Sequence, residues 1–347
     1  MAPQKKALNL KEVAKSLGVS TATVSNAFNR PDQLSEKLRA RILKEAAELG
    51  YFGPNLAARS LRKGQSDVIA VILADSLAYS FSDPVASQFL QGVSEVLFKH
   101  KKQLLLLSSQ LDAHDQNSAE SLPDGFIFYG KPEGNGIERI LRLGKPVIAV
   151  DFETQLCPTV NINNQEGARQ AALHAISSAE DRVAVLSLSL VDSKRICRLH
   201  DADIDAESQA ISQRRLAGYL QACQEKRVAL PSNLIWHIPV NTPELAEIAA
   251  NEALTVSPLP NIILCMSDVI ALAVIRQAKA LNIAIPEQLK VIGFDDIPEA
   301  SRVTPALASV CQRSIAKGRH AAEALLSGTP IASNELATEL VIRASCP

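Results

Sequence analysis

The sequence has few of the features that mark disulfide-bonded, metal-binding or membrane proteins. Its six cysteines are scattered with no Cys-x-x-Cys spacing, which favours reduced, buried thiols over disulfides or a metal site. The six histidines also lack the spacing of metal ligands. The cysteines stand at Cys157, Cys197, Cys223, Cys265, Cys311 and Cys346.

Long hydrophobic runs are missing too. The longest apolar-rich stretch, residues 256–275, contains Pro258, Pro260 and Asp268, so it predicts a strand followed by a helix and not a membrane span. The N-terminus is polar, which argues against a signal peptide. We therefore expect a cytoplasmic protein with no membrane partner.

The usual signatures of cofactor and nucleotide chemistry are absent from the sequence. There is no G-x-x-x-x-G-K-[ST] motif, no G-x-G-x-x-G after a predicted strand, and no histidine that pairs convincingly with a Ser or Cys nucleophile. The glycine cluster at residues 130–136 contains Pro132 and is typical of a loop. These absences predict a protein without a cofactor and without enzymatic activity.

What the sequence does have is an uneven distribution of charge. The 347 residues suggest two or three domains. Residues 1–65 hold 12 Lys and Arg against 5 Asp and Glu, a net of +7, while the remainder holds 24 against 32, a net of −8. A basic N-terminal module on an acidic body is suited to binding a polyanion at one end only.

The basic module has the pattern of a helix-turn-helix. Apolar residues at helical spacing follow a capping Asn9, and Gly18 then permits a left-handed turn. Ser20 can cap a second helix, Thr21–Phe28, with Val24, Ala27 and Phe28 on one face and small polar residues on the other. Such a second helix lies in the DNA major groove.

A third helix and a short fourth one complete the module. Ser35 can cap the third helix, whose expected buried stripe is Leu38, Ile42, Leu43, Ala46 and Leu49. Residues 19–29 read V-S-x-x-T-V-S-x-x-x-N, and residues 54–61 read P-N-x-x-A-R-S-L. In these two motifs the stretch from Leu10 to Leu61 resembles the DNA-binding headpiece and hinge helix of the LacI/GalR family of bacterial repressors.

The resemblance assigns DNA contacts residue by residue. It implies that Thr21, Ala22 and Asn26 meet base edges, where Asn can bond adenine and the Thr and Ala methyls can contact thymine. Further residues would mostly hold phosphates or complete the contact set. These are Leu10, Ser20, Thr23, Ser25, Asn29, Ser35, Lys37, Asn55, Ala58, Arg59 and Leu61.

The hinge segment, residues 55–61, is too short to be a stable helix alone in water. We expect it to fold when two subunits meet over an operator, with Leu61 wedged into the minor groove. The alternative is a linker helix packed on its own body.

From residue 67 onward, apolar strands alternate with amphipathic helices, which predicts parallel sheets in βαβ order. The expected strands are 68–73, 103–107, 125–129, 146–150, 183–188, 261–266 and 290–294. The expected helices are 85–99, 136–143, 164–176, 208–224, 242–254, 268–281 and 314–326. The material exceeds one sheet, so we expect an α/β fold with two doubly wound parallel-sheet subdomains and a cleft at the carboxyl ends of the strands.

This region also resembles the LacI/GalR effector-binding core, which is similar in fold to periplasmic sugar-binding proteins. The resemblance is carried by residues 215–219 (RLAGY), 267–271 (SDxxA) and 291–298 (VIGFDDIP). It implies a headpiece at 1–52, a hinge and linker at 53–65, and a core at 66–347. Within the core, one subdomain would span about 66–160 plus 300–330, and the other about 161–297 plus the tail. Two segments, 109–124 and 191–208, depart from the family in length.

Several polar residues are expected at the cleft. Arg215 and Asp295 can each grip neighbouring hydroxyls, which suits a sugar, although they could instead form a structural salt bridge. Trp236 could stack on a sugar ring or belong to the core. Asp268, like Ser267, could contact ligand or cap a helix. The remaining candidates, placed after predicted strands, are Asp75, Tyr79 and Asp151.

The resemblance implies a homodimeric transcriptional regulator, first of all a repressor, that binds double-stranded operator DNA and is therefore nucleoid-associated. A sugar or sugar derivative in the cleft would control it allosterically. A purine or nucleoside effector is the alternative within the family. A solute-binding protein is a further alternative, but it would have no use for residues 10–61, and a sugar-modifying enzyme would need catalytic groups that the cleft lacks.

Overall fold

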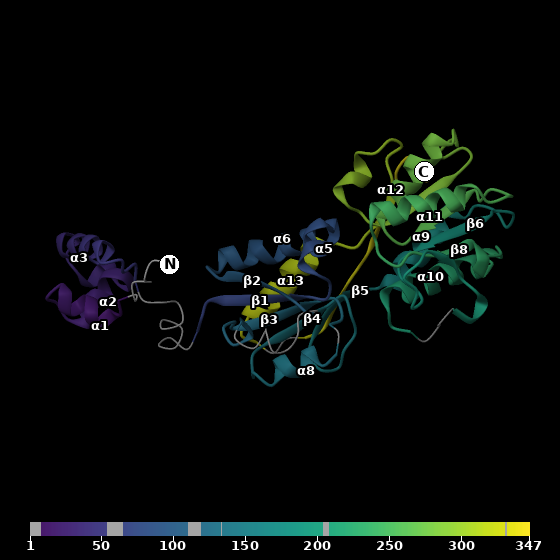
Figure 1. Cartoon of the computed structure of the whole chain (residues 1–347). Helices are drawn as coiled ribbons and strands as arrows, with labels where there is room; N and C mark the ends of the chain where they lie inside the picture. Colours follow the sequence, from purple (N-terminus) through teal and green to yellow (C-terminus); the bar gives the residue numbers. More distant parts are fainter. Residues whose placement is uncertain (1–7, 54–64, 110–118, 133, 204–207, 330–331) are drawn as a thin grey trace. The chain divides into compact units, whose positions relative to one another are not determined.

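The computed structural model describes residues 8–53, 65–109, 119–132, 134–203, 208–329 and 332–347 (Figure 1). The chain divides into two compact units, one of residues 1–68 with 122–124 and the other of residues 69–121 with 125–347. The expected hinge segment, including Asn55, Ala58, Arg59 and Leu61, lies outside the described residues. In the part of the chain that the structure describes, no helix has both the length and the apolar character to cross a membrane.

The first unit is the expected three-helix headpiece. Its elements are α1 (Leu10–Ser16), α2 (Thr21–Asn29), the 3-10 turn η1 (Pro31–Gln33) and α3 (Glu36–Glu48). The caps predicted from the sequence are present: Asn9 accepts from two backbone amides and forms a capping box with Glu12, while Ser20 and Ser35 cap α2 and α3. Gly18 adopts a φ of +64° between α1 and α2, which is the left-handed turn that glycine allows.

The headpiece core is built from the predicted helical faces. Its buried members are Val13, Ala14, Leu17, Val24, Ala27, Ile42, Ala46 and Tyr51. Leu49 was expected in the same stripe but is 38% exposed, because α3 ends at Glu48 and Leu49 is its C-cap.

The N-terminal lobe of the second unit holds a six-stranded sheet in the order β12-β5-β4-β3-β1-β2. Helices α6 and α13 cover one face of this sheet and α8 covers the other (Figure 1). Alternate residues of the central strands supply the two apolar layers. The strands are β1 (Val68–Leu73), β2 (Gln103–Ser108), β3 (Gly125–Tyr129), β4 (Val147–Val150), β5 (Thr159–Ile162) and β12 (Asn334–Leu336). The helices are α5 (Leu77–Ser82), α6 (Pro84–Lys99), α8 (Gly136–Leu141) and α13 (Ser314–Leu326).

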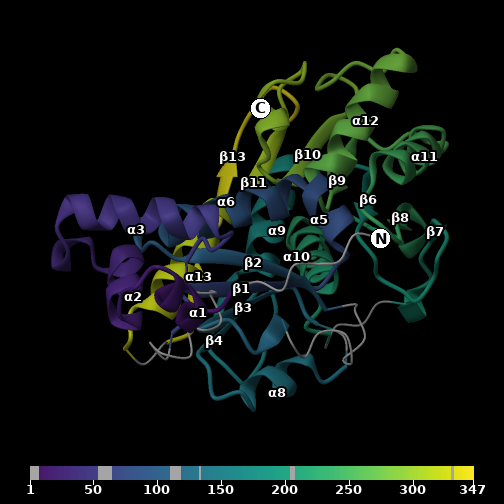
Figure 2. The same ribbon diagram turned by 60° about the vertical axis from the view of Figure 1, so that its left-hand side comes forward.

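The C-terminal lobe holds a seven-stranded sheet in the order β13-β11-β10-β9-β6-β8-β7. Helices α9 and α10 cover one face, and α11 and α12 cover the other (Figure 2). The strands are β6 (Val183–Ser187), β7 (Cys197–Arg198), β8 (Ile235–His237), β9 (Ile262–Cys265), β10 (Lys290–Asp295), β11 (Ala308–Cys311) and β13 (Glu339–Val341). The helices are α9 (Asn164–Ala175), α10 (Ile211–Lys226), α11 (Pro243–Leu254) and α12 (Asp268–Ala280), with short 3-10 turns η2 (Asp201–Asp203), η3 (Ser232–Leu234) and η4 (Pro298–Ser301).

This arrangement confirms the predicted fold class of two doubly wound parallel sheets, with one qualification: the edge strands β7 and β13 of the C-terminal sheet run antiparallel to β8 and β11. The chain passes between the lobes three times, after β5, after β11 and between β12 and β13. The second crossing was expected near residue 300. The structure places it between Cys311 and Ser314, because β11 pairs in parallel register with β10 and so extends the C-terminal sheet.

Candidate functional site

The α2 helix presents the residues expected to read DNA. Thr21 and Ala22 are exposed at its first turn, directly after the Ser20 cap. Asn26, one turn later, is half-buried and donates a hydrogen bond to Gln33 at 3.2 Å. Its amide is therefore held in place on the helix face that also carries the exposed first turn.

The remaining headpiece candidates are partly engaged in local structure. Thr23 bonds the Ser20 hydroxyl at 2.8 Å, and Asn29 donates to the Ser25 carbonyl at 3.0 Å. Ser35 caps α3 and Lys37 is exposed in its first turn, whereas Leu10 packs half-buried against the headpiece core. Exposed amides and hydroxyls at the starts of two helices are suited to phosphate contacts.

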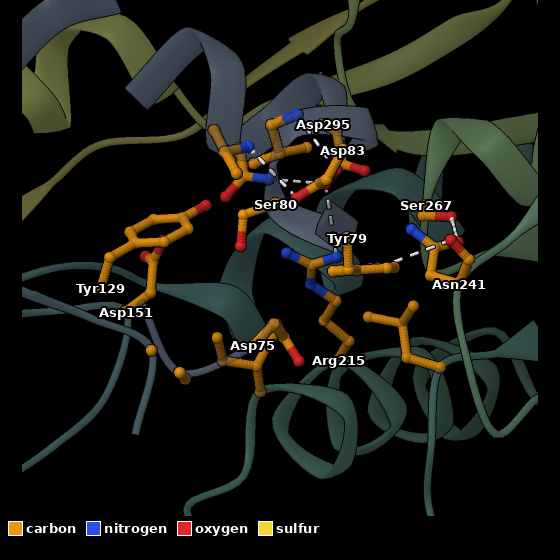
Figure 3. Close-up of a pocket in the computed structure, with 17 residues that line it drawn as sticks. Asp75, Tyr79, Ser80, Asp83, Tyr129, Asp151, Arg215, Asn241, Ser267 and Asp295 are labelled. Atoms are coloured by element: carbon orange, nitrogen blue, oxygen red, sulfur yellow. Dashed lines mark hydrogen bonds and ion pairs between the residues drawn. The ribbon is translucent and has the colours of Figure 1, made fainter. Parts of the chain in front are cut away.

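The second unit has a partly open cavity of about 220 Å³ at the carboxyl ends of strands from both lobes. Figure 3 shows Tyr129 and Asp151 on one side of it, Asn241 and Ser267 on the other, and Asp75 and Arg215 between them. A second cavity of about 530 Å³ adjoins the first and shares Asp75 and Asp151 with it. Its rim includes Ser189 and Ser208.

Arg215 is held rigidly in the cavity wall. Its Nε donates to Asn164 at 2.9 Å, and its Nη1 donates to the Met266 carbonyl and lies 3.6 Å from an oxygen of Asp295. The guanidinium stacks on the Phe294 ring at 3.6 Å. The salt bridge with Asp295 that the sequence left open is thus formed, and both partners still line the cavity.

Asp295 lies in an unusual backbone conformation at the end of β10, with a φ of 126°, and Asp296 follows at 56°. Gln312 donates to the Asp295 carboxylate at 2.6 Å. Burial raises the pKa of Asp295 to about 7, and the guanidinium of Arg215 works in the opposite direction. A carboxyl group with such a pKa can accept or donate a hydrogen bond near neutral pH.

Asp151, in a left-handed conformation after β4, is anchored from behind. The ammonium of Lys317, on α13, is fully buried and donates to the two Asp151 carboxylate oxygens at 2.7 and 2.6 Å. The same ammonium donates to Gln312 Oε1 at 2.8 Å. Gln312 therefore links the Asp151–Lys317 pair of one lobe to Asp295 of the other, at the point where the chain crosses between lobes.

The sequence reasoning placed eight residues at the cleft, and six of them line the cavity. The six are Asp75, Tyr79, Asp151, Arg215, Ser267 and Asp295. Ser267 also caps α12 through the Ile270 amide and donates to Asn241 at 2.7 Å. It therefore caps the helix, which is one of the two roles considered for it, while its contact with a ligand stays a prediction.

Trp236 and Asp268 do not line the cavity, which corrects two expectations. Trp236 is fully buried in the core under α11, with its indole N–H donating to Glu252 at 3.1 Å. Asp268 is also fully buried and accepts from the Ser309 hydroxyl and the Ile297 amide, so it holds the turn after β10. Burial raises the pKa of Asp268 well above its usual range.

Several cavity residues escaped the sequence reasoning. Asp83 reads as a helix cap before Pro84, Tyr129 as the last residue of an apolar strand, and Asn241 follows a strand of only three residues. Lys317, which lies behind the cavity wall and holds Asp151, also escaped, because a lysine inside an amphipathic helix is expected to be solvent-exposed. The rule that ligands meet the carboxyl ends of parallel strands could have found Tyr129.

Comparison with known proteins agrees with this architecture. The model described as "Bacterial regulatory proteins, lacI family" matches residues 9–55, and that of a "Periplasmic binding protein-like domain" matches residues 196–346. The HTH-type transcriptional regulator Rv3575c of Mycobacterium tuberculosis is 32% identical over 350 residues, covering 98% of this chain and 96% of the relative. The HTH-type transcriptional repressor CytR of Escherichia coli is 30% identical, covering 99% and 97%.

A solved structure, a complex of the transcriptional regulator CelR with cellobiose, has the same fold. Its TM-score is 0.67 at 23% identity, and the alignment covers 97% of this chain and 99% of that one. The relatives that match over nearly the whole chain, the matched headpiece and the two-lobed core all indicate the same family. The chain belongs to the LacI family of bacterial regulatory proteins, and it is a DNA-binding transcriptional regulator.

Proposed function

We propose that this regulator is a homodimeric repressor whose operator affinity is set by a sugar or sugar derivative bound between its lobes. The observation that carries the proposal is the cavity itself. Carboxylates, a guanidinium, two tyrosines and small polar groups from both lobes converge on one partly open cavity. The DNA-binding part of the proposed function follows from the membership of the LacI family.

The chemistry of the lining favours a polyhydroxyl ligand. The oxygens of Asp151 and Asp295 and the donors of Arg215 can each bond neighbouring hydroxyls, while Tyr79 and Tyr129 offer apolar ring faces together with phenolic oxygens. Burial raises the pKa of Tyr79 and Tyr129 above the usual range, so both phenols stay protonated. The related cellobiose complex supports the same ligand class.

The contacts across the crossing supply a route for coupling. A ligand that bonds Asp151 and Asp295 together touches both ends of the Lys317–Gln312 link and favours one arrangement of the lobes over another. Such a differential affinity is what an allosteric effect requires.

On the DNA side, the proposal rests on the sequence of the hinge segment. A helix of residues 55–61 that forms only on DNA, with Leu61 kinking the minor groove, would make operator binding sensitive to how the two subunits are held. Dimerisation follows from this proposal, because a pseudo-palindromic operator needs two headpieces.

The test combines a ligand screen with DNA binding. Thermal-shift measurements on the full chain against hexoses, pentoses, nucleosides and purines identify ligands that raise the melting temperature. Each hit is then titrated into a gel shift with the gene's own upstream region at two salt concentrations. We expect a sugar to weaken DNA binding; a hit among the purines or nucleosides would replace the sugar with that class.

Two variants separate the two halves of the function. Asn26→Ala should reduce DNA affinity at least tenfold and leave ligand affinity unchanged, since it lies in the headpiece alone. Asp295→Asn should weaken the ligand response and keep DNA affinity. A ligand that stabilises the wild-type chain but leaves its DNA affinity unaltered at every concentration would refute the allosteric proposal.

A further inference from the structure

The cavity carries more negative charge than a neutral sugar needs. Four carboxylates line it, those of Asp75, Asp83, Asp151 and Asp295, whereas Arg215 is the one cationic side chain among the described lining residues. The ammonium of Lys317 lies directly behind the wall. With both cations counted, two formal negative charges remain.

Two of the four carboxylates already have a cation. Asp151 is bonded to Lys317 through both oxygens, and Asp295 lies 3.6 Å from Arg215 while accepting from Gln312. Among the described residues, the structure gives Asp75 and Asp83 no ion pair. The excess charge of the cavity is therefore localised on these two side chains.

The two carboxylates have acceptor capacity left. Asp83 caps α6, and each of its oxygens accepts one backbone amide, from Val85 at 3.2 Å and Ala86 at 3.1 Å. A carboxylate oxygen has two lone pairs, so each can take a further donor. Partial burial raises the pKa of both carboxyl groups, although Asp75 is still exposed to solvent on one side, and the negative charge of Asp75 raises the pKa of Asp83 further. A cationic donor in the cavity would offset this cost.

Aromatic side chains stand beside these carboxylates. Tyr79 and Tyr129 border the same space (Figure 3), and Tyr129 stacks on Phe89 with a centroid distance of 4.3 Å, which fixes its ring. Acidic groups combined with tyrosine rings are the surroundings in which proteins bind organic ammonium groups.

We propose that the effector is a sugar derivative bearing a protonated amine, and that Asp75 and Asp83 bind this amine. The inference rests on the proposed function, because it assumes that the cavity takes a polyhydroxyl ligand. Arg215, Asp151 and Asp295 would then hold the hydroxyls, and the two unpaired carboxylates would select the cation.

The test compares sugars that differ in one group. Glucosamine, galactosamine and mannosamine are each measured against the parent hexose and the N-acetyl derivative by calorimetric titration of the full chain at pH 7. The amine should bind at least tenfold more tightly than its neutral partners in one or more of the three sets. Equal or tighter binding of the neutral hexoses would overturn the inference while leaving the sugar effector standing.

Variants assign the amine to its carboxylates. Asp75→Asn and Asp83→Asn remove charge at constant shape, and asparagine can still cap α6. Each should lower the preference for the amine over the hexose severalfold, and the double variant should abolish it. The exposed Asp201→Asn is the matched control and should keep the full preference. Retention of the preference in the double variant would refute the residue assignment.

Two further outcomes are decisive. If no amino sugar of the three sets binds, the amine inference is wrong, and the wider ligand screen still tests the sugar effector of the proposed function. If magnesium or calcium chloride alone stabilises the chain, and Asp75→Asn removes that effect, the two carboxylates hold a metal ion and the amine inference is wrong.

Discussion

Replacing Lys317 with methionine should destabilise the core strongly, because it strands a buried charge. The side chain of Lys317 is 0% exposed and that of its partner Asp151 is 9% exposed, with N–O distances of 2.7 and 2.6 Å. Methionine fills a similar volume but leaves the Asp151 carboxylate and Gln312 Oε1 without their common donor. Breaking one side of a buried ion pair costs about 3–5 kcal/mol.

This cost can be read from thermal unfolding of the full chain without ligand. For a domain of this size, each kcal/mol corresponds to a few degrees, so the melting temperature should fall by roughly 6–15 °C. Lys279→Met, at an exposed site of α12, is the control and should change stability by less than about 0.5 kcal/mol.

A double variant distinguishes the stranded charge from lost packing. Asp151→Asn removes the charge, and asparagine tolerates the left-handed backbone at this position, where φ is 62°. Lys317→Met with Asp151→Asn should therefore recover at least half of the lost stability, as a favourable coupling in the double-mutant cycle. If the double variant is as unstable as Lys317→Met alone, the electrostatic account of this pair is refuted.

Three further predictions follow from other parts of the structure. Gly218→Ala should lower the free energy of unfolding by about 1–3 kcal/mol, because the added Cβ would lie 2.1 Å from the Gln165 carbonyl oxygen where α10 packs on α9. Gly136→Ala is the control and should be nearly neutral, because its added Cβ would lie 3.5 Å from the nearest atom, in Pro132. Burial raises the pKa of Asp295 to about 7 from an ordinary 3.8, so its contribution to stability is complete below about pH 4 and is lost as the pH rises to 7. The melting temperature of wild type relative to Asp295→Asn should thus decline over this window; a constant difference would contradict the assignment. Ser20→Ala removes the α2 cap, worth about 1 kcal/mol, so amide exchange at Thr23 should accelerate roughly fivefold, and an unchanged rate would show that the cap is dispensable.

The parts of the fold that could be predicted are those whose sequence pattern is local. Asn9, Ser20 and Ser35 cap their helices as expected, since a cap depends on residues within one turn. The buried strands β1 and β3 have the predicted bounds, because both are continuous apolar runs.

The parts that could not be predicted depend on distant partners. Strands β5, β8 and β11 have only three or four residues, and they exist because neighbouring strands pair with them. Because β11 was not expected, the predicted lobe boundary lay too early in the chain. Because β8 was not expected, Trp236 was considered as a cleft residue and not only as a core residue.

The candidate site shows the same division. Asp75, Asp151, Ser267 and Asp295 follow predicted strands, so the topology alone brought them to the cavity. Lys317 and Gln312 could not be found in this way, because their roles arise from a contact between α13 and the end of β4 that no local pattern encodes. Asp268 resembled its neighbours in sequence, but its side chain turns toward Ser309 and Ile297.

We propose that ligand binding in the cavity and DNA binding by the headpiece are energetically coupled. Coupling of this kind requires that each ligand changes the affinity for the other by the same factor. The affinity of the full chain for operator DNA is measured with and without saturating cavity ligand, and ligand affinity is measured with and without operator. The account predicts that the two ratios are equal and lie between about 5 and 150, the range of typical allosteric coupling. A ligand that binds the cavity tightly while both ratios equal one would contradict it.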